Sequence, residues 1–137
     1  MQAYDSIEYF LWIPASENRF RHNRRGSRLS NKRIALILSG SIAAYRSPDL
    51  IRGLRREGAE VQVFATADAL RYVAQEALEW TSLNSVLTES SPNAEHLSDN
   101  SPFSAYLVAP ATYNLLNKFA WGIADDLPTA LLASALG

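Results

Sequence analysis

Three short apolar runs, separated by segments of helical character, constrain the fold of this 137-residue chain more than any other feature. The runs occupy residues 34–38, 61–65 and 105–109. Each is nearly continuous in apolar residues, a pattern typical of strands buried on both faces of a parallel sheet. Because strands and helices alternate along the chain, we expect an α/β fold. The predicted architecture is a doubly wound parallel sheet, Rossmann-like or flavodoxin-like, with a layer of helices on each side.

The segments around these runs predict four helices. We expect them after residue 40 and up to 57, and at residues 68–78, 112–121 and 125–136. Pro48 leaves two alternatives for the first helix: Ser47 caps a new start with Pro48 at its first position, or one helix bends there. Gly58 and Gly122 suit helix ends, and Asp125 suits the N-cap of the last helix.

The charge distribution divides the chain into two parts. Residues 19–33 carry seven of the thirteen Lys and Arg residues and no acid. Such a run can touch nucleic acid or anionic lipid, but a solvated linker is the favoured interpretation, and His22 within it is expected to be a surface residue. We therefore predict an N-terminal extension with a basic linker at residues 1–31 and one domain at residues 32–137.

The composition disfavours several classes of protein. The chain contains no cysteine, which removes disulfides, thiolate metal sites and a cysteine nucleophile from this chain. No apolar run approaches the roughly 18 residues that span a bilayer, and residues 9–14 do not resemble a secretory signal. We expect a cytoplasmic protein with no membrane or nucleic-acid partner.

The first candidate binding residues follow the first apolar run. Gly40 allows a tight turn with close backbone approach, and the helix expected after it offers N–H groups and partial positive charge to a phosphate near Ser41 and Ile42. The alternative is a glycine turn with Ser41 as a helix cap. A dinucleotide fingerprint and a P-loop are both absent, which disfavours NAD and ATP.

Three further residues follow the second and third runs. The Thr66 hydroxyl suits the phosphate or ribityl chain of a mononucleotide, although helix capping is the better-supported role for Thr66 taken alone. Asn114 offers both a donor and an acceptor, as the pyrimidine edge of a flavin requires. For Thr112 the alternative role is again a helix cap.

His96 lies in the polar stretch 84–104, which we expect to form a long loop. The unperturbed pKa of histidine, near 6.5, suits a proton carrier at neutral pH, but a lone loop histidine is more often an ordinary surface residue. Asp125 and Asp126 have no third acidic or imidazole partner nearby in the sequence, so helix capping is preferred and no metal site is predicted.

Taken together, these signatures resemble the flavin-dependent cysteine decarboxylases, most closely the phosphopantothenoylcysteine decarboxylases of coenzyme A synthesis. Residues 40–45 read GSIAAY, Thr66 is followed six residues later by Tyr72, and His96 precedes Pro110 by fourteen residues. Residues 122–127, GIADDL, match the family's motif letter for letter. The resemblance covers roughly residues 32–137.

The resemblance implies a cofactor, an assembly and a reaction. The phosphate of FMN would lie on Gly40, Ser41 and Ile42, with Thr66 nearby. Thr112 and Asn114 would face the flavin. His96 would be the acid–base residue, at a flavin site shared between subunits of a homo-oligomer, a trimer or a multiple of trimers. FMN would oxidise the cysteine thiol of 4′-phosphopantothenoylcysteine to a thioaldehyde, CO₂ would leave, and the reduced flavin would return a hydride to give 4′-phosphopantetheine.

The sequence departs from the family pattern in several places. Tyr113 and Leu115 replace the usual Ala and Thr of the asparagine motif, and Ile37 stands where many relatives have glycine. The family's later Pro-x-Met-Asn motif and its cysteine do not occur here, so we expect the domain to be truncated at its C-terminus. Alternatives are a flavin prenyltransferase or peptidyl-cysteine decarboxylase on the same scaffold, or a non-catalytic FMN-binding regulatory subunit.

Overall fold

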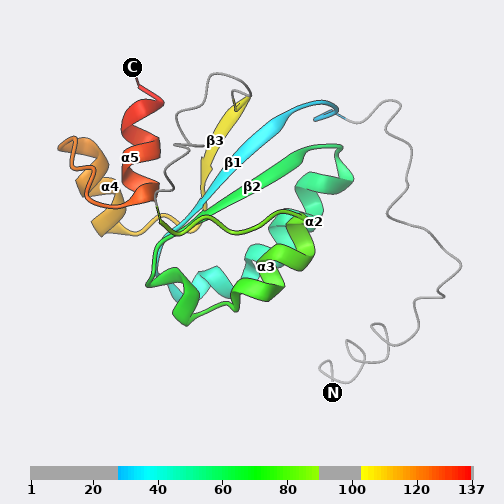
Figure 1. Cartoon of the computed structure of the whole chain (residues 1–137), viewed down its shortest axis with the longest axis horizontal. Coiled ribbons are helices and arrows are strands. Elements are labelled where there is room, and N and C mark those ends of the chain that lie inside the picture. Colours follow the sequence, from blue (N-terminus) through cyan, green and yellow to red (C-terminus); the bar gives the residue numbers. More distant parts are fainter. Residues whose placement is uncertain (1–27, 90–102, 137) are drawn as a thin grey trace, which may run out of the picture.

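The computed structural model describes residues 28–89 and 103–136 (Figure 1). Its centre is a parallel sheet of three strands in the order β2-β1-β3. The strands are β1 (Arg33–Leu38), β2 (Glu60–Ala65) and β3 (Ala105–Val108). Leu36 in the central strand pairs with Val63 on one side and Leu107 on the other. The three predicted strands and their parallel arrangement are confirmed, and Leu87 adds an isolated parallel bridge to Phe64.

One face of the sheet is covered by the helices between β1 and β2 and after β2. These are η2 (Ile42–Arg46), α2 (Ser47–Arg56), η3 (Ala69–Arg71) and α3 (Gln75–Ser82). Ile51 of α2 and Leu78 of α3 are fully buried against Leu36 and Val63 of the sheet. The buried hydrophobic residues on this face form what we call the first cluster, and all of them are aliphatic. Their burial away from water stabilises the fold through the hydrophobic effect.

The opposite face is covered by α4 (Tyr113–Ala120) and α5 (Leu127–Ser134) (Figure 1). Leu115 and Leu131 pack there against Ile37 and Phe64, which alternate along their strands with the residues of the first cluster. Helices therefore lie on both faces, and the predicted three-layer α/β/α architecture is confirmed. No helix in residues 28–89 or 103–136 is long and apolar enough to cross a membrane.

The helix predicted at residues 68–78 is wrong as a single element. The structure has the short η3, then an extended residue, Ala74 with φ −67° and ψ 138°, and only then α3. The step buries Val73 together with Ala69 and Leu78 in the first cluster. The helix is interrupted at Ala74 because the interruption lets these side chains pack in the core. No proline or glycine marks the interruption in the sequence.

Two predicted caps also need correction. Of the two alternatives at Pro48, a fresh start capped by Ser47 is wrong: Ser47 is already helical, and Arg46 is the cap residue without a side-chain bond. The 3-10 helix η2 runs directly into α2, which is nearer to the alternative of one bent helix. At α5 the cap is Asp126, not Asp125: the Asp126 carboxylate accepts the Thr129 N–H at 2.9 Å, and the Thr129 hydroxyl accepts the Asp126 N–H at 3.1 Å. This reciprocal pair satisfies two N–H groups at the start of α5.

Candidate functional site

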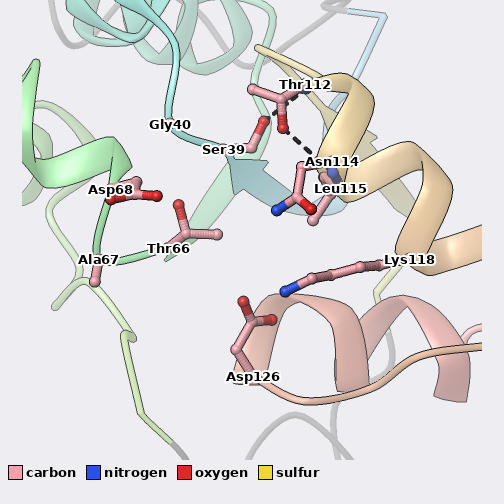
Figure 2. A pocket seen from close by; sticks show the side chains of 10 residues that line it. All are labelled: Ser39, Gly40, Thr66, Ala67, Asp68, Thr112, Asn114, Leu115, Lys118 and Asp126. Atoms are coloured by element: carbon pink, nitrogen blue, oxygen red, sulfur yellow. Dashed lines mark hydrogen bonds between the residues drawn. The ribbon is translucent and has the colours of Figure 1, made fainter.

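A cavity of about 280 Å³ opens where the three strands end (Figure 2). It lies beyond the carboxyl ends of β1, β2 and β3, the place where doubly wound sheets bind ligands. Its walls come from the loops after the three strands and from the helices α4 and α5. The lining residues are Ser39, Gly40, Thr66, Ala67, Asp68, Thr112, Asn114, Leu115, Lys118 and Asp126.

Ser39 joins the end of β1 to the loop after β3. Its side chain is buried, and its hydroxyl donates to the Pro110 carbonyl oxygen at 2.6 Å and accepts the Thr112 N–H at 2.9 Å. The backbone N–H of Ser39 also donates to the Pro110 carbonyl at 3.3 Å. One hydroxyl therefore fixes two backbone groups of the neighbouring loop, and with them the start of α4.

Gly40 is required by the close approach of two loops. A Cβ added at Gly40 would lie 2.4 Å from the Cβ of Asp68 and 3.2 Å from the Asp68 carbonyl carbon. Because those atoms are backbone or next to it, rotation of a side chain would not relieve the contact. The glycine thus lets the loop after β1 touch the loop after β2. The close approach to a phosphate that the sequence predicts at Gly40 stays a prediction.

Thr66 and Thr112 both line the cavity, and each hydroxyl accepts a backbone N–H three residues later. The Thr66 hydroxyl accepts the Ala69 N–H at 3.2 Å, and the Thr112 hydroxyl accepts the Leu115 N–H at 3.3 Å. The N-cap residue of η3 is Asp68, so the capping alternative is wrong for Thr66; it is confirmed for Thr112, the N-cap of α4. Neither bond competes with binding, because a hydroxyl that accepts a bond still carries a proton that it can donate.

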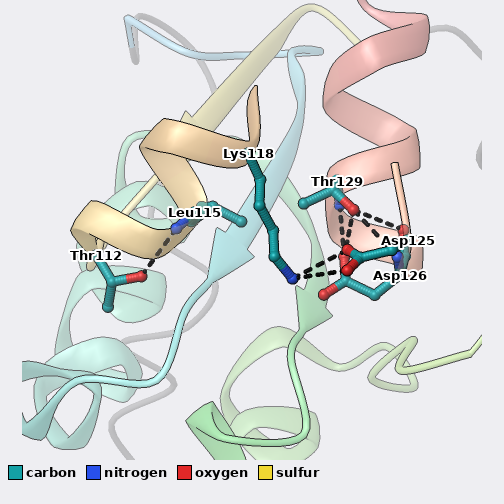
Figure 3. Close-up of polar contacts among 6 residues, drawn as sticks. All are labelled: Thr112, Leu115, Lys118, Asp125, Asp126 and Thr129. Carbon is teal, nitrogen blue, oxygen red and sulfur yellow. Dashed lines mark hydrogen bonds and ion pairs between the residues drawn. The ribbon is translucent and has the colours of Figure 1, made fainter. Parts of the chain in front are cut away.

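Lys118 lies one turn beyond Asn114 on α4, and both line the cavity (Figure 2). The Lys118 ammonium donates to both carboxylate oxygens of Asp125, at 3.0 and 2.9 Å (Figure 3). This hydrogen bond raises the pKa of Lys118 and lowers the pKa of Asp125. The pair ties α4 to the turn before α5 and keeps a protonated amine at the cavity wall.

Carboxylates are also present at the cavity. Asp126 lies beside Lys118, and Asp68 lies on the opposite wall with a long ion pair of 3.9 Å to Arg71 (Figure 2). Within residues 28–89 and 103–136, no group of three or more His, Asp or Glu side chains is arranged to hold a metal ion. A second hollow of about 370 Å³ shares Asp126 with the cavity.

The structure brings together Gly40, Thr66, Thr112 and Asn114, four of the residues proposed from the sequence. Two others lie just outside the lining. Ser41 caps η2 by accepting the Ala43 N–H at 3.3 Å, and Ile42 is exposed in the first turn of η2. His96 lies outside the described residues, so the predictions for His96 stay predictions.

The other six lining residues were not proposed from the sequence; they are Ser39, Ala67, Asp68, Leu115, Lys118 and Asp126. A signal existed for Lys118, because a residue four positions after Asn114 shares its helix face. None existed for Asp68, since only the folded chain shows that its loop meets Gly40.

The model of the family described as Flavoprotein matches residues 22–137. The chain belongs to the flavoprotein family. Among curated relatives of this flavoprotein, the coenzyme A biosynthesis bifunctional protein CoaBC of Methanocaldococcus jannaschii is 37% identical over 106 residues, which are 76% of this chain and 26% of that protein. CoaBC of Bacillus subtilis is 36% identical over 112 residues, 78% of this chain and 28% of that protein. The chain thus spans about a quarter of the length of these relatives.

Solved structures resemble this flavoprotein in the same region. The FMN-dependent cysteine decarboxylase SpaF superposes with a TM-score of 0.71 at 27% identity, covering 77% of this chain and 64% of SpaF. A PPC decarboxylase mutant complexed with pantothenoylaminoethenethiol superposes with a TM-score of 0.56 at 25% identity, covering 75% and 60%. The family resemblance and the fold expected from the sequence are both confirmed.

Proposed function

We propose that this flavoprotein binds FMN and decarboxylates 4′-phosphopantothenoylcysteine to 4′-phosphopantetheine in coenzyme A biosynthesis. The observation that carries the proposal is that Gly40, Thr66, Thr112 and Asn114 line one cavity. Gly40, Thr66 and Thr112 lie in the loops after the three strands, and Asn114 lies in the first turn of α4. They are four of the six residues that the family resemblance assigns to FMN. The CoaBC relatives and the PPC decarboxylase structure support the substrate.

The cavity has the donor set that FMN requires. Thr66 and Thr112 supply hydroxyl protons for phosphate and ribityl oxygens, and the Asn114 amide supplies a donor and an acceptor for the pyrimidine edge. The phosphate would lie near Gly40, at the start of the segment that carries Ser41 and Ile42. When bound, FMN supplies a hydride acceptor for the substrate thiol; the protein's own part is to orient both and to move protons.

We assign the acid–base role to His96. It is one of two histidines in the chain, and His22 lies in the basic segment before the domain. A positioned acid–base group typically contributes about 10²–10⁴-fold to rate. Removing the His96 imidazole should therefore abolish most turnover without changing the phosphate contacts.

The same proposal includes a cytoplasmic homotrimer, or a multiple of trimers, that needs no nucleic acid. Support comes from the surface beside the cavity, where Tyr113 and Trp121 are 86% and 82% exposed. Strand β3 also lies at the sheet edge with two exposed residues among four. Sedimentation should give a mass of three chains or a multiple; a folded monomer that holds FMN would contradict this part.

Two assays test the proposed function. FMN titration by fluorescence quenching should show near-equimolar binding in the micromolar range, and CO₂ release from 4′-phosphopantothenoylcysteine should require bound FMN. His96→Asn should lose turnover and keep FMN, while the matched control His22→Asn should keep both. A folded protein that binds no FMN would overturn the cofactor and the reaction together.

A second candidate is a non-catalytic FMN-binding subunit. It is favoured by Leu115, which stands where the family has threonine. Leu115 is 3% exposed and packs with Ile37 and Phe64 on the face under α4 and α5, so an apolar core contact replaces the hydroxyl contact. FMN binding without CO₂ release from any cysteine substrate would select this candidate. Release from a peptide with a C-terminal cysteine, or prenylation of FMN, would instead select another enzyme of the scaffold.

A further inference from the structure

Lys118 is the cationic side chain of the cavity lining. The lining within the described residues includes two carboxylates, Asp68 and Asp126, but no second Lys or Arg. The chain as a whole has two lysines, and the other, Lys32, lies just before β1, at the opposite end of the sheet. Among the described lining residues, Lys118 is therefore the side chain that can offer a compensating positive charge to an anionic group beside it.

The geometry holds this charge in one place. The Lys118 side chain is 26% exposed, and its ammonium donates to both carboxylate oxygens of Asp125. Asn114 and Lys118 lie one turn apart on the same face of α4 (Figure 2). A planar ligand whose edge meets the Asn114 amide would therefore lie close to the Lys118 ammonium.

We propose that Lys118 is a flavin-binding residue that favours the anionic reduced flavin over the neutral oxidised flavin. The inference rests on the proposed FMN site. Two electrons and one proton from a reductant convert the neutral ring into an anion whose charge is shared by N1 and the C2 carbonyl, at the pyrimidine edge. A cation within about 4–6 Å of such a group favours its charged form. Without Lys118, the carboxylates of Asp125 and Asp126 would remain on that side of the cavity with no cation among the described lining residues, and they would disfavour the anion.

The test compares dissociation constants for oxidised FMN and for dithionite-reduced FMN, measured anaerobically on the same preparations. The quantity compared is the ratio of the dissociation constant for oxidised FMN to that for reduced FMN. This ratio should be similar for the native protein and for Lys32→Met, and lower for Lys118→Met. We expect Lys118→Met to lower this ratio at least about tenfold, equivalent to about 30 mV in a two-electron potential. Lys118→Arg, which keeps the charge, should retain most of the ratio.

The possible results separate this inference from the proposed function. If the native protein binds no FMN, the proposed function fails and the inference fails with it. If the native protein binds FMN and Lys118→Met leaves the ratio unchanged, Lys118 has no such role and the FMN site stands. Should Lys118→Met not fold, Lys118→Gln, which can still donate to Asp125, replaces it and the same tenfold criterion decides.

Discussion

The two faces of the sheet differ in how completely apolar side chains close them. The face under α2 and α3 is closed by aliphatic side chains from both helices and from alternate positions of β1 and β2. The face under α4 and α5 buries fewer residues and gives way, at the carboxyl ends of the strands, to a cavity with hydroxyl, amide, amine and carboxylate groups. The comparison indicates that the first face supplies most of the stability, while α4 and α5 supply most of the side chains for binding.

The largest expected effect tests this division directly. Leu36→Ala, in the centre of the first cluster, should lower the free energy of unfolding by about 2–5 kcal/mol because the closed face leaves a void. Leu115→Ala should cost less, since Leu115 borders the cavity on one side. Urea denaturation measures both, with the half-exposed Leu116→Ala as control. Equal costs at Leu36 and Leu115 would contradict the division.

The next effect concerns the contact between the loops after β1 and β2. Gly40→Ala should destabilise by about 1–3 kcal/mol and weaken FMN binding, because its Cβ would overlap Asp68. The matched control is Gly53→Ala in α2, where a Cβ would meet nothing within 4 Å; that change should stabilise by about 0.5–1 kcal/mol. Thermal melting measures the stability of both variants, and FMN titration measures their affinity for FMN. A Gly40→Ala protein as stable as Gly53→Ala would refute the close approach.

A smaller effect is expected at the junction between the two faces. Ser39→Ala removes the hydroxyl that bonds the Pro110 carbonyl and the Thr112 N–H, and should cost about 1–2 kcal/mol. Because Thr112 starts α4, FMN affinity should fall as well. Ser134→Ala, which removes one bond to the Leu131 carbonyl at the exposed end of α5, is the control. Unchanged FMN affinity in folded Ser39→Ala would show that the junction does not shape the cavity.

The smallest expected effect is the pH dependence of the Lys118–Asp125 pair. Because the pKa of Asp125 is lowered in the folded state, its contribution to stability is present above its ordinary value of 3.8 and is lost as the pH falls through the lowered value. The pKa of Lys118 is raised, so its contribution is lost only as the pH rises above 10.5. Asp125→Asn should therefore lose less stability than the native protein between pH 4 and pH 2, compared by urea midpoints. Parallel acid profiles would show that the pair does not contribute to stability.

Much of the fold follows from local pattern. The three apolar runs predicted the strands, and Gly58 and Gly122 marked turns that the structure forms with φ of +93° and +68°. The interruption at Ala74 and the shift of the cap to Asp126 were not predictable in this way. Both depend on which neighbouring residue gains more by packing or pairing in the folded chain, and local propensity is too weak to decide between adjacent residues.

The candidate site divides in the same way. Motif spacing along the sequence determined the family, the strand ends at which a ligand would lie, and four residues that meet there: Gly40, Thr66, Thr112 and Asn114. Only the tertiary structure decided that Ser39 holds one loop to another, that Asp68 faces Gly40, and that Asp125 holds Lys118 at the cavity. These contacts join residues brought together by the pairing of strands and the packing of helices, and distances through space are not encoded in any local stretch of the chain.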